Sequence, residues 1–118
     1  MKFLLKILVT SLAVLFSSYL LPGVVVASFT TAILVAIVIA LLNTFLKPIL
    51  ILLTIPVTVL TLGLFLLVIN AFIILLTSEL VRGFSVDGFW WALLFSIILS
   101  VITSLLESIA GPNKQTQA

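Results

Sequence analysis

Four long apolar runs constrain the fold of this chain, and proline, glycine or charged residues stand at the breaks between them. They cover residues 3–21, 29–46, 64–80 and 89–106, so each is 17 to 19 residues long. A helix needs about 20 residues to cross the roughly 30 Å hydrocarbon core of a bilayer, where every backbone group must be paired within the protein. Only 7% of the chain is charged and 64% is hydrophobic. The sequence therefore predicts an all-α membrane protein with four transmembrane helices.

The breaks between the runs predict where the helices begin and end. Pro22 and Gly23 follow the first run, and Ser28 precedes the second run as a candidate N-cap. Lys47 and Pro48 are predicted to end the second helix, because proline cannot continue the backbone ladder. The third run begins after Gly63. The last run follows Asp87 and Gly88, so the four helices are expected as two hairpins.

The two hairpins resemble each other when the chain is shifted by sixty residues. Residues 21–49 and 81–109 then align without a gap and share eight identities, among them Gly23 with Gly83 and Phe29 with Phe89. About three identities would arise by chance in a composition this biased. We therefore expect a single membrane domain containing an internal repeat, with repeat 1 at about 4–49, a linker segment at 50–63 and repeat 2 at about 64–109.

The apolar segment at 49–62 is too short to cross a bilayer comfortably. It is 14 residues long, has Pro56 near its middle and contains Thr54, Thr58 and Thr61. Segments of 10 to 14 such residues are typical of re-entrant or interfacial structure, which is the expectation here. A fifth span is the alternative. It would make the two hairpins inverted copies instead of parallel ones.

The distribution of basic residues favours a cytoplasmic N-terminus. With four spans, Lys2, Lys6, Lys47 and Lys114 lie inside and only Arg82 lies outside, which also places the C-terminus in the cytoplasm. A five-span arrangement satisfies the same rule equally well, so charge alone does not fix the second hairpin. A cleaved secretory signal is an alternative interpretation of the first run, but the sixty-residue register favours a retained span.

Small residues recur at every fourth position in the second and fourth runs. This spacing lets helix backbones approach closely in lipid, where serine can also form hydrogen bonds between helices. We expect the face to pack helices within one chain, with an oligomer contact or a pore lining as the alternative. The residues concerned are Ala32, Ala36, Ala40 and Thr44, followed by Ala92, Ser96, Ser100, Ser104 and Ser108.

Two amides and one aromatic cluster complete the candidate site residues. Asn43 and Asn70 fall within the second and third runs, where a buried amide must find hydrogen-bond partners. We expect them to join neighbouring helices, with a polar step in a conduction path as the alternative. Phe89, Trp90 and Trp91 begin the fourth run and are expected to anchor it at the outer membrane interface.

The sequence offers no pattern typical of an enzyme. Cysteine and histidine are absent, and the three acidic residues are scattered. General acid-base and nucleophilic schemes require convergent polar groups, so no catalytic, cofactor or metal site is predicted. The net charge of +2 is too small to indicate a nucleic-acid partner. The expected partner is the lipid bilayer, with a homo-oligomer as a further possibility.

Three stretches resemble a known family. They are residues 42–48, residues 60–71 and residues 83–90, with Asn, Pro and Gly at fixed places in long apolar strings. The chain is similar to the small bacterial membrane proteins of the four-span phage-holin family, the mycobacterial holin superfamily IV. This resemblance implies four spans in a bacterial inner membrane. The preferred function is a non-enzymatic envelope or scaffold protein. The alternatives are a holin-like oligomer that permeabilises the membrane and a small channel or transporter subunit.

Overall fold

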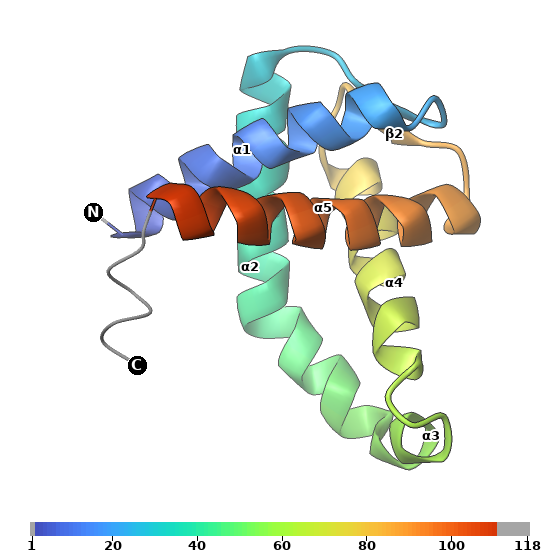
Figure 1. The fold of residues 1–118 in the computed structure, drawn as a ribbon. Coiled ribbons are helices and arrows are strands. Elements are labelled where there is room, and N and C mark those ends of the chain that lie inside the picture. Colours follow the sequence, from blue (N-terminus) through green and yellow to red (C-terminus); the bar gives the residue numbers. More distant parts are fainter. Residues whose placement is uncertain (1, 111–118) are drawn as a thin grey trace.

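A computed structural model describes residues 2–110 and is mostly helical (Figure 1). The elements follow one another as α1 (Lys2–Leu20), β1 (Val24–Val26), α2 (Phe29–Leu53), α3 (Ile55–Leu60), α4 (Phe65–Leu80), β2 (Phe84–Val86) and α5 (Phe89–Ala110). The order helix, strand, helix thus occurs twice, and the short helix α3 joins the two halves. The predicted polar tail at 111–118, with Lys114, lies outside the described residues.

The two strands pair with each other and hold the tips of both hairpins together. Pairing is antiparallel, with Val25 opposite Ser85. Beyond the strands, the Ala27 amide donates to the Gly83 carbonyl at 2.9 Å, and the Asp87 amide donates to the Gly23 carbonyl at 2.9 Å. Val25 and Ser85 are sixty residues apart. The donors of the two flanking hydrogen bonds, Ala27 and Asp87, are also sixty residues apart, and so are their acceptors. The ribbon is therefore symmetric about its central pair.

The four long helices pack as a closed ring of neighbours. α1 contacts α2 and α5, and α4 contacts the same two helices. α1 and α5 run side by side in opposite directions, and both cross the α2 and α4 pair (Figure 1). The strands lie at one end of this arrangement. The end of α2, the helix α3 and the start of α4 lie at the other end (Figure 1).

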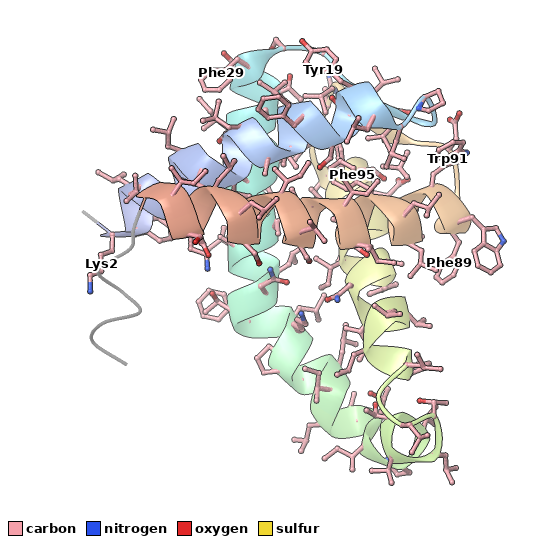
Figure 2. All side chains as sticks on the ribbon, viewed as in Figure 1. Lys2, Tyr19, Phe29, Phe89, Trp91 and Phe95 are labelled. Carbon is pink, nitrogen blue, oxygen red and sulfur yellow. The ribbon has the colours of Figure 1, made fainter. Side chains whose placement is uncertain are left out.

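The apolar core sits next to the strands. Val14, Ala32, Ala92 and Phe95 are completely enclosed, and the Phe95 ring lies 5.6 Å from the Phe84 ring. Figure 2 shows Phe95 pointing in among the helices near this ribbon. Small residues of α2 and α5, among them Ala32 and Ala92, are buried in this core. The core therefore closes the molecule at the end that carries the strands.

The predicted end of the second helix at Lys47 and Pro48 is wrong. α2 continues through Pro48 to Leu53. A proline removes one backbone donor but is tolerated in apolar helices whose other hydrogen bonds remain intact. The helix ends at Thr54, whose amide donates to the carbonyls of Ile51 and Leu50. Pro56 follows two residues later and cannot supply the next helical donor.

The predicted apolar segment at 49–62 divides between two elements. Its first residues complete α2, and six others form α3, which spans only about 9 Å and buries no residue. Leu62 and Gly63 then reverse the chain with φ angles of 57° and 89°. Between α2 and α4 the structure has no further long helix, and α2 ends at the same end of the molecule at which α4 begins (Figure 1).

Within residues 2–110, three helices are long and apolar enough to cross a membrane, namely α1, α2 and α5. α4 is equally apolar but shorter, at 16 residues. Helix starts agree with the sequence to within one residue, and Ser28 is the N-cap of α2, accepting a hydrogen bond from the Thr31 amide at 3.2 Å. The expectation of an all-α chain is corrected by the two three-residue strands, which lie in the breaks between the first and second runs and between the third and fourth runs.

Candidate functional site: a polar cavity between the helices

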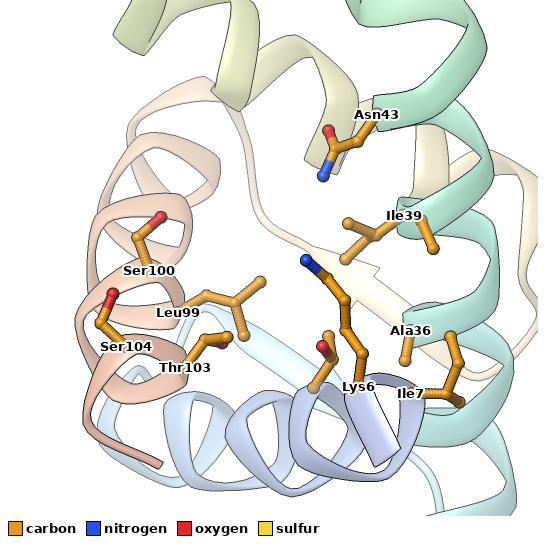
Figure 3. Close-up of a pocket in the computed structure, with 11 residues that line it drawn as sticks. Lys6, Ile7, Ala36, Ile39, Asn43, Leu99, Ser100, Thr103 and Ser104 are labelled. Atoms are coloured by element: carbon orange, nitrogen blue, oxygen red, sulfur yellow. The ribbon is translucent and has the colours of Figure 1, made fainter. Parts of the chain in front are cut away.

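A cavity of about 240 Å³ lies where α1, α2 and α5 meet (Figure 3). Each helix contributes both apolar and polar side chains to its wall. The polar ones are Lys6, Thr10, Asn43, Ser100, Thr103 and Ser104, and the apolar ones are Ile7, Ala36, Ile39, Ala40 and Leu99.

A second hollow of about 100 Å³ adjoins the first and brings in the remaining long helix. The two hollows share Ile39, Asn43, Leu99 and Ser100. The second adds Lys47 from α2, Asn70, Ile73 and Ile74 from α4, and Ser96 from α5. All four long helices therefore surround one polar region, which we call the central cavity and define as these two hollows together.

The charge of the central cavity has one sign. Lys6 and Lys47 are in its wall, and among the described residues that line it none is acidic. Figure 3 shows the Lys6 side chain extending from α1 into the cavity, toward the side where Asn43 stands on α2. The other polar atoms are amides and hydroxyls, which can donate hydrogen bonds. The site is consequently a positively charged hollow rich in donors.

The central cavity is closed toward the strands. Along α1 its wall ends at Thr10, and the enclosed core residue Val14 lies one turn further on. Along α5 the wall ends at Ser96, followed toward β2 by Phe95 and Ala92, both completely buried. The apolar core therefore separates the cavity from the end of the molecule that carries the strands.

The structure divides the small-residue face into two parts. Near the strands, Ala32, Ala36, Ala92 and Ser96 are buried within the chain, with exposed fractions of at most 5%. Farther along, Ala40, Ser100 and Ser104 line the central cavity. Thr44 is exposed and donates to the Ala40 carbonyl at 2.8 Å. Ser108 is also exposed and is not part of the described cavity wall.

The two asparagines lie in the cavity wall. Asn43 borders both hollows, and Asn70 borders the smaller one. Neither side chain takes part in the side-chain hydrogen bonds found among residues 2–110. The predicted role of joining helices is thus not the arrangement seen, and both amides remain available to a bound group.

The aromatic cluster at the start of α5 has two different environments. Trp90 is 73% exposed and Phe89 packs edge to face on it, with ring centroids 5.7 Å apart. These two side chains remain candidates for anchoring at the interface. Trp91 is half-buried and covers Gly23, where a Cβ atom would collide with the indole ring. Its position couples α5 to the turn before β1.

Sequence reasoning missed four cavity residues. The sequence indicates Lys6 only as a basic residue of the cytoplasmic side and Lys47 as part of a helix end, and it gives Thr10 and Thr103 no predicted role. One signal was present: Thr10 and Asn70 are sixty residues apart, and so are Asn43 and Thr103. These two pairs of polar residues share the sixty-residue spacing, which is the feature of the sequence that connects them.

Long apolar helices with exposed leucine, valine and phenylalanine side chains define a multi-pass membrane protein. Within that class, the chain belongs to the family described as the mycobacterial 4 TMS phage holin family, superfamily IV, whose model matches residues 1–105. The family resemblance inferred from the sequence is thereby confirmed.

Two relatives extend this assignment. The "Uncharacterized membrane protein YvlD" of Bacillus subtilis (strain 168) is 37% identical over 107 residues, which cover 90% of each chain. The "Uncharacterized protein SCO3922" of Streptomyces coelicolor (strain ATCC BAA-471 / A3(2) / M145) is 48% identical over 82 residues, 66% of each chain. No solved structure matches the chain.

Proposed function

We propose that this protein is a non-enzymatic, non-lytic protein of the bacterial inner membrane whose four spans enclose a polar cavity open only toward the cytoplasm. The observation that carries the proposal is the closure of the central cavity by the apolar core around Phe95 and Val14. A continuous water path would need an open lumen along the whole length of the helices, and the packed side chains of Val14 and Phe95 fill that space. A cavity that ends halfway instead suits the binding of a polar group from one side.

The four-span arrangement is supported by the pairing of β1 with β2. If all four long helices cross the bilayer, paired tips require both hairpins to point the same way, as parallel copies of one unit. α4, at about 24 Å, is shorter than the hydrocarbon core, and local thinning of the bilayer compensates such a mismatch at modest cost. The family description of four spans favours the same count.

A cytoplasmic N-terminus is supported by the places of the basic residues. Lys2 begins α1 and Lys47 lies near the end of α2, so each is at the end of its own helix that points away from the strands, whereas Arg82 adjoins β2 (Figure 1). Basic residues concentrate on the cytoplasmic side of inner-membrane proteins. The central cavity then faces the cytoplasm, and the ribbon with Trp90 lies at the outer surface.

A holin-like oligomer that permeabilises the membrane is the second candidate, and the family description is the observation that favours it. The burial of the small residues within one chain argues against such an oligomer. Ala32, Ala36, Ala92 and Ser96 are already buried within one chain, so they are not available to neighbouring copies. A small channel or transporter subunit is a third candidate, favoured by the cavity itself.

The test is inducible expression of the full chain in bacteria with continuous recording of the membrane potential. The proposal predicts an unchanged potential and continued growth at high expression, with the protein recovered from the inner membrane. A known pore-forming protein expressed to the same level serves as the positive control. Depolarisation that rises with the expression of this chain would contradict the non-lytic proposal and favour the holin-like one.

A further inference from the structure

We infer that the central cavity binds a phosphate group, and that the phosphate belongs to the headgroup of an anionic phospholipid of the cytoplasmic leaflet. This inference rests on the proposed function, because it requires the cavity to open on the cytoplasmic side. It is carried by the charge, the hydrogen-bonding groups, the size and the surroundings of the cavity.

The positive charge of the central cavity favours an anionic ligand. Lys6 and Lys47 border the central cavity, and within its described wall no carboxylate offsets them. Two ammonium groups near the bilayer, without an acidic neighbour in the same hollow, are stabilised by an anion that enters it. A cationic ligand would be repelled by the two lysines, and a neutral ligand would lack the attraction between opposite charges.

The hydrogen-bonding groups fit a phosphate. The ammonium groups can each donate up to three hydrogen bonds, and the Asn43 and Asn70 amides can donate two each. Hydroxyls of Ser100, Thr103 and Ser104 stand on the opposite wall. These donors come from different helices and surround one volume, which suits an acceptor with several oxygens more than a planar or monodentate anion.

The size and surroundings point to a lipid. Each ordered water occupies about 30 Å³, so the larger hollow, at about 240 Å³, has room for a polar headgroup. Large apolar side chains are exposed on the outer faces of the same helices, including Leu8 and Leu12 on α1 and Leu41 on α2. Acyl chains can lie along these faces while the headgroup occupies the cavity.

The test is native mass spectrometry of the full chain, purified in detergent and titrated separately with phosphatidylglycerol, phosphatidylcholine and inorganic phosphate. Two matched variants each remove two positive charges. Lys6→Gln/Lys47→Gln changes the cavity, and Lys2→Gln/Arg82→Gln changes lysine and arginine residues that do not line it. Ser100→Leu keeps both lysines but fills the cavity. Helix content and monodispersity of each variant are checked by circular dichroism and size-exclusion chromatography.

The wild type is expected to bind phosphatidylglycerol in preference to phosphatidylcholine. Loss of the charged hydrogen bonds in Lys6→Gln/Lys47→Gln should weaken that binding about tenfold or more, whereas Lys2→Gln/Arg82→Gln should stay within about twofold of the wild type. Ser100→Leu should weaken it through bulk alone, so the inference remains testable if the cavity double variant does not fold.

The outcomes separate the two sources of phosphate and the two proposals. Binding of phosphatidylglycerol without inorganic phosphate supports the lipid. If the protein binds inorganic phosphate but not phosphatidylglycerol, and the cavity variants lose this binding, the cavity is a phosphate site for a soluble ligand and the lipid is excluded. Equal losses in both double variants, or no preference for either anion over phosphatidylcholine, would overturn the inference. If that result were found while expression of the chain left the membrane potential unchanged, the phosphate site would be wrong and the proposed non-lytic function would still hold.

Discussion

Gly23 and Trp91 are the pair of residues on which the joining of the two hairpins depends most closely. Trp91 is in the first turn of α5 and lies directly over Gly23, which precedes β1. The equivalent position in the other half, Gly83, lies close to Thr31, whose Oγ1 atom would be 3.0 Å from an added Cβ. Thr31 and Trp91 are themselves sixty residues apart. Both contacts exist because glycine leaves room for a side chain of the opposite hairpin.

Gly23→Ala is therefore expected to destabilise the protein by about 1–3 kcal/mol, because the new methyl group must displace the Trp91 ring in a packed region. Unfolding in mixed detergent, followed by circular dichroism, measures the loss. Val25→Ala, on the exposed side of the same strand, should change stability by less than about 0.5 kcal/mol. The double variant Gly23→Ala/Trp91→Ala should lose less free energy of unfolding than the two single variants lose together. Simple additivity would show that the two residues do not interact.

At the scale of the element, β1 and β2 explain why sequence reasoning stopped short of this fold. The helices follow from apolar runs and the Ser28 cap, but strands of three residues fall below the length at which alternation can be recognised. Their partners lie sixty residues away, and their pairing is set by tertiary structure. The cavity was hidden for a similar reason. Lys6, Thr10 and Asn70 come to border one cavity only when the four long helices pack together.

The ribbon can be tested by covalent trapping. The chain contains no cysteine, so Val25→Cys/Ser85→Cys introduces a single pair. Opposite residues of an antiparallel pair lie about 4.5–5.5 Å apart at Cα, within the range of a disulfide. Mild oxidation should protect both thiols from later alkylation, as measured by the mass of the intact chain. Val25→Cys/Leu62→Cys joins opposite ends and should stay reduced. Equal oxidation of both pairs would contradict the ribbon.

The small-residue face of α5 gives a second prediction for this scale. Ser96 is 5% exposed in the packed part of the helix, whereas Ser100, one turn later, is exposed to the cavity. Ser96→Leu should destabilise the fold by about 1–3 kcal/mol through overpacking, and Ser100→Leu should leave stability nearly unchanged. Detergent unfolding compares the two. A larger loss of stability for Ser100→Leu than for Ser96→Leu would mean that neighbouring helices pack against Ser100, which would contradict an open cavity there.

At the scale of the whole molecule, two hairpins joined at their tips enclose one hollow that the apolar core closes at one end. The arrangement accounts for the polar residues at matched places in both halves, and for small residues that face inward on α2 and α5. It also accounts for an outer surface of leucine, valine and phenylalanine suited to lipid. The strands mark one side of the molecule, and Lys2 and Lys47 lie toward the far ends of two crossing helices (Figure 1).

The most direct test of this account is the side from which Ser100→Cys reacts. A membrane-impermeant thiol reagent is applied to sealed vesicles of known orientation that contain this single-cysteine variant, with Ser85→Cys in the ribbon as the control for the opposite face. Ser100→Cys should react in inside-out vesicles and be protected in right-side-out ones, while Ser85→Cys should show the reverse. Reaction of Ser100→Cys from both sides, or only from the side that labels Ser85→Cys, would contradict a cavity closed by the core and open to the cytoplasm.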